Sequence, residues 1–114
     1  MPPATNFDFG DVVLVPFPFT DQTASKKRPA VVISSSRLHR ESVDLVIIAV
    51  TTQTRPTSSL EVSINQWQTA GLLRPSVIKP VVATVDRTLV LRRLGKLADP
   101  DRAAVKKALA ELLG

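Results

Sequence analysis

Short runs of apolar residues, separated by polar turns, dominate the first four fifths of the chain. Val12–Phe17, Ala30–Ser34 and Leu45–Val50 are rich in β-branched residues and are bounded by residues typical of turns. This pattern predicts three β-strands. Leu60–Ile64 alternates apolar and polar residues, as expected for a strand with one face toward solvent.

Two further extended stretches, Val77–Val85 and Leu89–Leu97, are joined by Asp86 and Arg87. Both have the composition of strands. Pro80 interrupts the first of them. Because proline has no N–H to donate to a neighbouring strand, we expect an edge position or a bulge there.

The end of the chain has the periodicity of an amphipathic helix. Asp99 is expected as the N-cap, Pro100 as the first helical residue, and Asp101 as a charge that complements the helix dipole. Gly114 closes the helix, and Arg102 is expected on its exposed face. One apolar stripe is formed by Ala104, Val105, Ala108, Leu109 and Leu112, which indicates packing across the open end of a sheet.

Polar loops are expected at Pro18–Lys27 and Thr52–Ser59, and loops of this length in a compact domain are often functional. Asn65–Ala70 is interpreted as one helical turn that ends at Gly71. Many short strands and one terminal helix predict a mainly β fold with α, a small curled antiparallel barrel. A length of 114 residues indicates one domain, residues 1–114.

The charge of the chain indicates a polyanionic partner. The formal net charge is +5 and the pI is about 10.3, which favours nucleic acid first and an acidic protein second. Basic residues gather in four clusters, at 26–28, 37–40, 92–96 and 102–107. The chain has only four Phe and one Trp, which argues against a platform of aromatic rings for single strands.

The location of the protein is predicted from what the sequence lacks. It has no cysteine, which fits a reducing cytoplasm. The N-terminus does not have the basic and apolar segments of a signal peptide. The longest apolar run, Leu45–Val50, is too short to cross a bilayer. We therefore expect a cytoplasmic protein with no membrane partner.

Histidine and metal chemistry have little support in the sequence. His39 is the only histidine, and no cluster of His, Cys, Asp and Glu has the spacing of metal ligands. We therefore predict no metal and no other cofactor. His39 lies between Arg37, Arg40 and Glu41, so we expect an exposed histidine in a charged connector rather than a member of a catalytic triad.

Two polar groups at strand ends could nevertheless act on RNA. If the ribose 2′-hydroxyl attacks its own phosphate, the protein has only to position the substrate and stabilise charge. The guanidinium of Arg28 could clamp two phosphate oxygens, and the hydroxyl of Thr51 could donate one more hydrogen bond. From the residues alone, a structural interpretation stays open: an arginine at a loop end and two β-favouring threonines.

Taken in order, these segments resemble the MazF/PemK family of toxin endoribonucleases. The resemblance extends from Phe9 to Leu113 and is carried by the strings FGDVVLVPF at 9–17, KKRPAVVI at 26–33, AVTTQ at 49–53, GLLRP at 71–75 and LRRLGKL at 91–97. It implies an SH3-like barrel, a homodimer and sequence-specific, metal-independent cleavage of single-stranded RNA. The products would be a 2′,3′-cyclic phosphate and a 5′-hydroxyl, and growth would stop until an acidic antitoxin covers the site.

Residue by residue, the resemblance assigns Arg28 and Thr51 to catalysis and Gln53 to RNA binding. The other expected RNA contacts are Lys26, Lys27, Thr52, Arg55 and Asp21. Members of the family carry a glutamate in the loop before the arginine, whereas residues 20–27 contain none, and Asp21 is the candidate to replace it.

Two alternatives stay open. One is a non-catalytic barrel that binds nucleic acid or protein, which an intact Arg28 and Thr51 disfavour. The other is a toxin that poisons gyrase on the same fold, which the string Thr51-Thr52-Gln53 disfavours.

Overall fold

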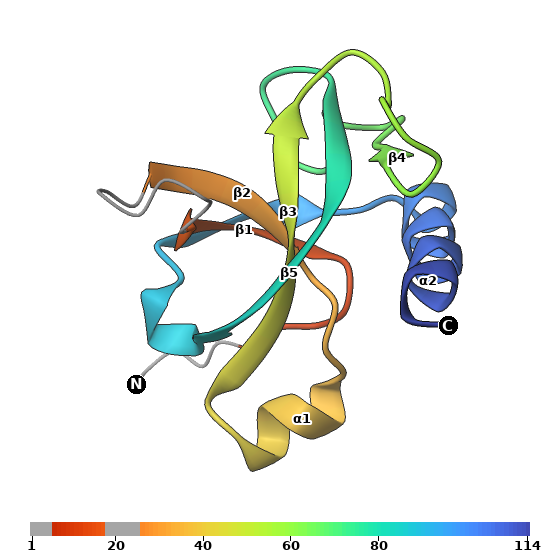
Figure 1. Cartoon of the computed structure of the whole chain (residues 1–114). Helices are drawn as coiled ribbons and strands as arrows, with labels where there is room; N and C mark the ends of the chain where they lie inside the picture. The colour runs from red at the N-terminus through yellow and green to blue at the C-terminus, as the bar shows by residue number, and fades with distance from the viewer. Residues whose placement is uncertain (1–5, 18–25) are drawn as a thin grey trace.

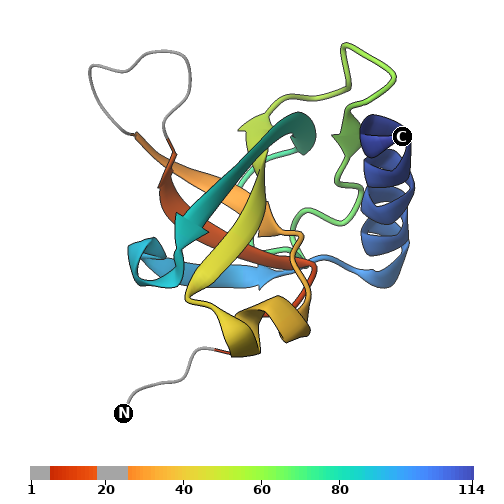
Figure 2. The same ribbon diagram turned by 60° about the horizontal axis from the view of Figure 1, so that its bottom comes forward.

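The computed structural model describes residues 6–17 and 26–114, with the side chain of Phe17 left out. Six strands form one sheet in the order β4-β5-β3-β2-β1-β6, and every pair of neighbours is antiparallel. The elements are β1 (Asp11–Phe17), β2 (Lys26–Val32), α1 (Ser36–Glu41), β3 (Asp44–Thr52), β4 (Val62–Ser63), β5 (Ser76–Asp86), η1 (Arg87–Leu89), β6 (Arg92–Lys96) and α2 (Asp99–Leu113). The sheet curls on itself, and α2 lies beside β4 (Figures 1 and 2). This confirms the predicted curled antiparallel barrel with a C-terminal helix.

The continuous apolar runs of the central strands exist because both faces of the sheet are covered. Alternate residues point to opposite faces of a strand. One set packs with α2 and the segment before β5, and its members include Val12, Val31, Ile48, Val50 and Val105. The other set lies on the opposite face and includes Val13, Val15, Ala30, Val32, Ile47 and Ala49.

The proline in β5 marks a bulge, as the sequence predicts. Ile48 pairs with Val82, and Val50 pairs with Ile78. Ala49 on β3 therefore stands opposite the three residues 79–81, among them Pro80. The extra residues bend β5 without requiring the missing N–H of proline.

Several strand boundaries differ from the prediction. Strand β2 begins at Lys26 rather than at Ala30, because the ladder with β1 continues to Pro16↔Lys27 and Phe17↔Lys26. Strand β4 has only two residues. Leu89, expected in a strand, ends the 3-10 helix η1, which Asp86 caps by accepting a hydrogen bond from the backbone N–H of Thr88 at 2.8 Å.

The prediction of an exposed His39 in a connector is wrong. Residues 36–41 form the helix α1, with Ser35 as its N-cap, and His39 is buried. Its Nδ1 lies 2.6 Å from the carbonyl oxygen of Phe7, and its Nε2 lies 2.6 Å from Oγ of Ser34. The histidine therefore fastens the N-terminal segment and α1 to the sheet.

The C-terminal helix is where the sequence predicts it, but its start differs. Ala98 is the N-cap, without a side-chain hydrogen bond, and Asp99 is the first helical residue. Asp101 is buried, and its two carboxylate oxygens accept the backbone N–H groups of Asn65 (3.0 Å) and Gln66 (2.9 Å). The side chain of Asp101 thus fastens the segment before β5 to α2.

Residues 65–71 form the expected helical turn. The N–H of Ala70 donates to the carbonyl of Gln66 at 3.2 Å, and that of Gly71 donates to the carbonyl of Gln68 at 3.0 Å. Gly71 has φ 81°, a conformation that glycine adopts without strain. The turn lets Ile64, Ala70 and Leu72 enter the same core as α2.

Candidate active site

Arg28 and Thr51 lie near the ends of two adjacent strands. Strands β2 and β3 are paired up to Ala30↔Ala49, and each of the two residues lies two positions beyond that pair. Side chains two positions apart share a face of a strand. Arg28 and Thr51 therefore belong to the face that carries Ala30 and Ala49, at one end of the sheet.

Each of the two residues also pairs with a residue on the strand at its other side. Arg28 pairs with Val15 of β1, and Thr51 pairs with Val77 of β5. Val15 and Val77 are fully buried, whereas Arg28 and Thr51 are half-buried. The two polar residues thus lie at the border between the core and solvent.

Thr52 points to the other face of the sheet, because it is the next residue along β3. It is exposed and lines a cavity together with Pro29, the residue after Arg28. The two threonines therefore face different surroundings, although they are neighbours in sequence.

Gln53 is tied into the loop that follows β3. Its backbone N–H donates to the carbonyl of Pro75 at 3.1 Å. Its side-chain Nε2 donates to the carbonyl of Arg55 at 2.8 Å and to Oε1 of Glu61 at 3.2 Å. These contacts shape the loop that carries the exposed Arg55.

Glu61 is a residue that the sequence analysis did not select, and it organises this loop. Its carboxylate accepts hydrogen bonds from the backbone N–H of Thr57 at 2.8 Å and from Nζ of Lys79 at 3.0 Å. Its side chain is only 6% exposed. The hydrogen bond from the Thr57 backbone, followed by that from Lys79, lowers the pKa of Glu61 to about 2. The only signal for Glu61 in the sequence was that it is a polar residue in the alternating stretch Leu60–Ile64.

Two further predicted contacts are basic and lie at the same end of β2. Lys26 and Lys27 are exposed in the first two positions of that strand. Asp21 lies outside the described residues.

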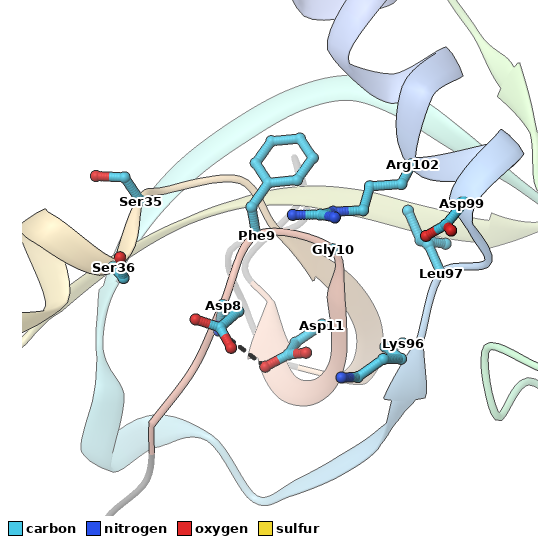
Figure 3. A pocket seen from close by; sticks show the side chains of 10 residues that line it. All are labelled: Asp8, Phe9, Gly10, Asp11, Ser35, Ser36, Lys96, Leu97, Asp99 and Arg102. Atoms are coloured by element: carbon cyan, nitrogen blue, oxygen red, sulfur yellow. Dashed lines mark hydrogen bonds between the residues drawn. The ribbon is translucent and has the colours of Figure 1, made fainter.

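A cavity of about 420 Å³ lies elsewhere, at the other ends of β1 and β2 (Figure 3). Its lining includes Asp8, Asp99 and Lys96, and none of the predicted site residues. The expectation that Arg102 is exposed is wrong. Arg102 is half-buried in this lining, and its guanidinium lies 5.7 Å from the centre of the Phe9 ring.

Across residues 6–17 and 26–114, no three His, Cys, Asp or Glu side chains are grouped so that they could hold a metal ion. In the same part of the chain, no helix is long and apolar enough to cross a membrane. What the strand ends do offer is a guanidinium, a hydroxyl and nearby ammonium groups. Such groups can bind a phosphate and stabilise added negative charge on it.

Several solved structures with this fold are toxins or toxin–antitoxin complexes. A mycobacterial endoribonuclease in complex with its cognate antitoxin superposes with a TM-score of 0.75 at 18% identity, covering 97% of this chain and 96% of that one. The MazE–MazF complex of Deinococcus radiodurans gives 0.75 at 22% identity, with 96% and 98% covered. The Mycobacterium tuberculosis toxin MazF-mt6 gives 0.73 at 18%, with 90% and 95% covered.

Identities this low establish a shared fold. No curated protein matches the chain. The family model described as "PemK-like, MazF-like toxin of type II toxin-antitoxin system" matches residues 8–113. Because that match covers nearly the whole chain, this protein belongs to the family of PemK-like and MazF-like toxins of type II toxin–antitoxin systems.

Proposed function

We propose that the chain is the toxin of a type II toxin–antitoxin pair and that it cleaves single-stranded RNA in a sequence-specific manner. The observation that carries the proposal is the pairing register, which sets Arg28 and Thr51 on one face at one end of neighbouring strands. Family membership and the endoribonucleases of the same fold support it.

The reaction uses a nucleophile of the substrate. The ribose 2′-oxygen forms a bond to phosphorus while the bond from phosphorus to the 5′-oxygen breaks. The 2′-proton passes to water, and the departing 5′-oxygen takes one up. The products are a 2′,3′-cyclic phosphate and a 5′-hydroxyl, and neither a metal nor another cofactor is required.

In this mechanism Arg28 clamps two non-bridging oxygens of the scissile phosphate, and the hydroxyl of Thr51 donates to the same group. Both interactions strengthen as negative charge accumulates in the transition state. Lys26, Lys27 and Arg55 attract the neighbouring phosphates, with Thr52, Gln53 and Asp21 as further contacts with the RNA.

The active form is a homodimer in the cytoplasm, in which both subunits face one RNA channel. Apolar side chains on the surface, among them Val82, Leu89 and Leu91, are candidates for burial between subunits. An acidic antitoxin segment that folds on binding would occupy the positive channel.

The test is incubation with a long single-stranded RNA in excess chelator, followed by mapping of the ends. We expect discrete cuts with 5′-hydroxyl ends. A requirement for magnesium or manganese, or ends with a 5′-phosphate, would contradict the proposed mechanism. RNA that stays intact under all conditions would favour the non-catalytic barrel, and damage to gyrase would favour a gyrase poison.

The variant Arg28→Ala distinguishes a specific role of Arg28 in cleavage from a general effect of positive charge on RNA binding. It should slow cleavage by about 2–4 kcal/mol in the activation free energy, the usual loss for one preorganised transition-state donor. Arg37→Ala is the matched control, since the Arg37 side chain is 81% exposed on α1 and pairs only with Glu41 in the described structure. Equal rates for the two variants would remove Arg28 from the site.

A further inference from the structure

A cavity of about 360 Å³ lies beside the candidate active site, on the opposite face of the same strands. Its floor is a row of three residues across the sheet, in which Pro29 of β2 pairs with Leu14 of β1, and Leu14 pairs with Arg92 of β6. Because residues opposite one another on paired strands share a face, the two apolar side chains and the arginine form one continuous surface.

The facing wall is the segment 71–76, and the backbone of β6 holds it in place. A Cβ on Gly71 would stand 2.0 Å from the carbonyl oxygen of Leu94, and a Cβ on Gly95 would stand 2.7 Å from the carbonyl of Ala70. Only glycine permits so close an approach. The wall is therefore built into the fold, and Leu72 is buried within it.

The rim of the cavity is polar and positive. Thr52 and Arg74 are exposed at its edge, and Ser76 donates its hydroxyl to the carbonyl of Arg74 at 2.8 Å. Leu73 also lines the cavity and is 93% exposed. An apolar slot with one arginine in its floor and another at its edge suits a flat, apolar group that is attached to an anion.

Chain continuity links this cavity to the catalytic residues. Pro29 follows Arg28, and Thr52 follows Thr51. Within each pair, one side chain belongs to the catalytic face and the other to the cavity. A strand of RNA that crosses this end of the sheet can thus place a phosphate on one face and an adjacent base on the other.

We propose that this cavity binds one unstacked base of single-stranded RNA, next to the scissile phosphate, and so contributes to the choice of cleavage sequence. The inference rests on the proposed ribonuclease function. Single-stranded RNA is recognised by bases that are splayed out, stacked on flat side chains or guanidinium planes, and hydrogen-bonded at their edges. The cavity offers the ring of Pro29, the guanidinium groups of Arg74 and Arg92, and the hydroxyl of Thr52.

Cleavage mapping on a random RNA pool tests the proposal. Leu73→Ala and Arg74→Ala change exposed side chains and should leave the fold intact. We expect each to weaken the preference at one position of the cleavage sequence about tenfold, while cuts continue. Leu113→Ala, an exposed leucine at the end of α2, and Arg37→Ala are the controls. Unchanged preference at every position in both cavity variants would overturn the proposal.

A binding experiment gives a readout that does not depend on cleavage. The four ribonucleoside monophosphates are titrated separately into the protein, and the leucine methyl groups are followed by NMR. We expect at least one nucleotide to shift the methyl signals of Leu14, Leu72 and Leu94, while inorganic phosphate and the methyl signals of Leu109 serve as controls. If no nucleotide moves these signals more than phosphate does, the base site does not exist, even in a protein that cuts RNA. If they move but RNA is not cut, the base site stands and the proposed function fails.

Discussion

The ammonium group of Lys79 lies 3.0 Å from the carboxylate of Glu61, and this ion pair joins the bulged part of β5 to the end of the loop that follows β3. The same carboxylate accepts the side-chain amide of Gln53 and the backbone N–H of Thr57. The segment directly after Thr51 and Thr52 is therefore held at several points by one carboxylate. These hydrogen bonds stabilise the loop next to the candidate catalytic residues, although Glu61 itself is not expected to contact the substrate.

Glu61 should make the stability of the protein depend on pH in a defined window. The pKa of Glu61 is lowered from 4.5 to about 2 in the folded protein, so folding favours the ionised form. The contribution of ionised Glu61 to the free energy of unfolding is present above pH 4.5 and is lost as the pH falls from there toward 2. Urea denaturation of the native protein and of Glu61→Gln, at several pH values, measures the difference.

We expect the stability gap between the native protein and Glu61→Gln to be present at pH 7 and to shrink below pH 4.5. Glu111→Gln, on the exposed side of α2, is the control for loss of a carboxylate. A gap that is the same at pH 7 and pH 2.5 would show that Glu61 is not stabilised as an anion.

Thr51 should matter less than Arg28, because a neutral hydroxyl forms a weaker hydrogen bond to a charged phosphate than a guanidinium does. We expect Thr51→Ala to slow single-turnover cleavage by an amount between those of Arg28→Ala and Arg37→Ala. Thr51→Ser keeps the hydroxyl and should recover most of the rate. Failure of serine to recover it would mean that Thr51 acts through packing on Val77, its partner on β5.

His39 should be a stability residue with no part in cleavage. The carbonyl of Phe7 can only accept, so it takes a hydrogen bond from Nδ1–H, and in the neutral imidazole Nε2 then accepts the hydroxyl proton of Ser34. His39→Ala leaves the carbonyl of Phe7 without this donor and the hydroxyl proton of Ser34 without an acceptor, although Oγ of Ser34 still accepts the N–H of Val46. The expected cost is about 2–5 kcal/mol in the free energy of unfolding. Arg40→Ala, an exposed neighbour on α1, should change it by less than about 0.5 kcal/mol. A large loss of cleavage rate in folded His39→Ala would contradict this assignment.

An acidic antitoxin segment should bind faster at low salt than at high salt, because its encounter with the basic strand ends is steered by charge. Stopped-flow association rates between about 50 mM and 500 mM salt measure this dependence. The double variant Lys26→Ala/Lys27→Ala should reduce the dependence of the association rate on salt. In an RNA cleavage assay, the antitoxin segment should also inhibit this variant less strongly than the native protein. A salt-independent rate, or an inhibited complex in which Arg28 stays accessible to RNA, would argue against occupation of the channel.

Local pattern was enough to predict most of the fold. Apolar runs with β-branched residues mark β1, β3 and β5 in the sequence, and Pro80 marks the bulge, because strand propensity and the missing N–H of proline are properties of the residues themselves. The apolar stripe of α2 is likewise local. The candidate catalytic pair was also selected from the sequence, through polar groups at strand ends and the family resemblance.

Contacts between distant segments were decided only by the tertiary structure. His39 sits in a charged string, and its burial depends on Phe7, which lies 32 residues away. Glu61 and Lys79 become partners because β4 pairs with β5 at Val62↔Ile78, which brings the next residue of each chain segment opposite the other. No periodic pattern in the sequence predicts such contacts, because each of them depends on how the curled sheet brings distant segments of the chain together. The sequence by itself thus determined the strands, the helix and the residue types of the site, whereas long-range packing decided which side chains are buried, paired or open to a substrate.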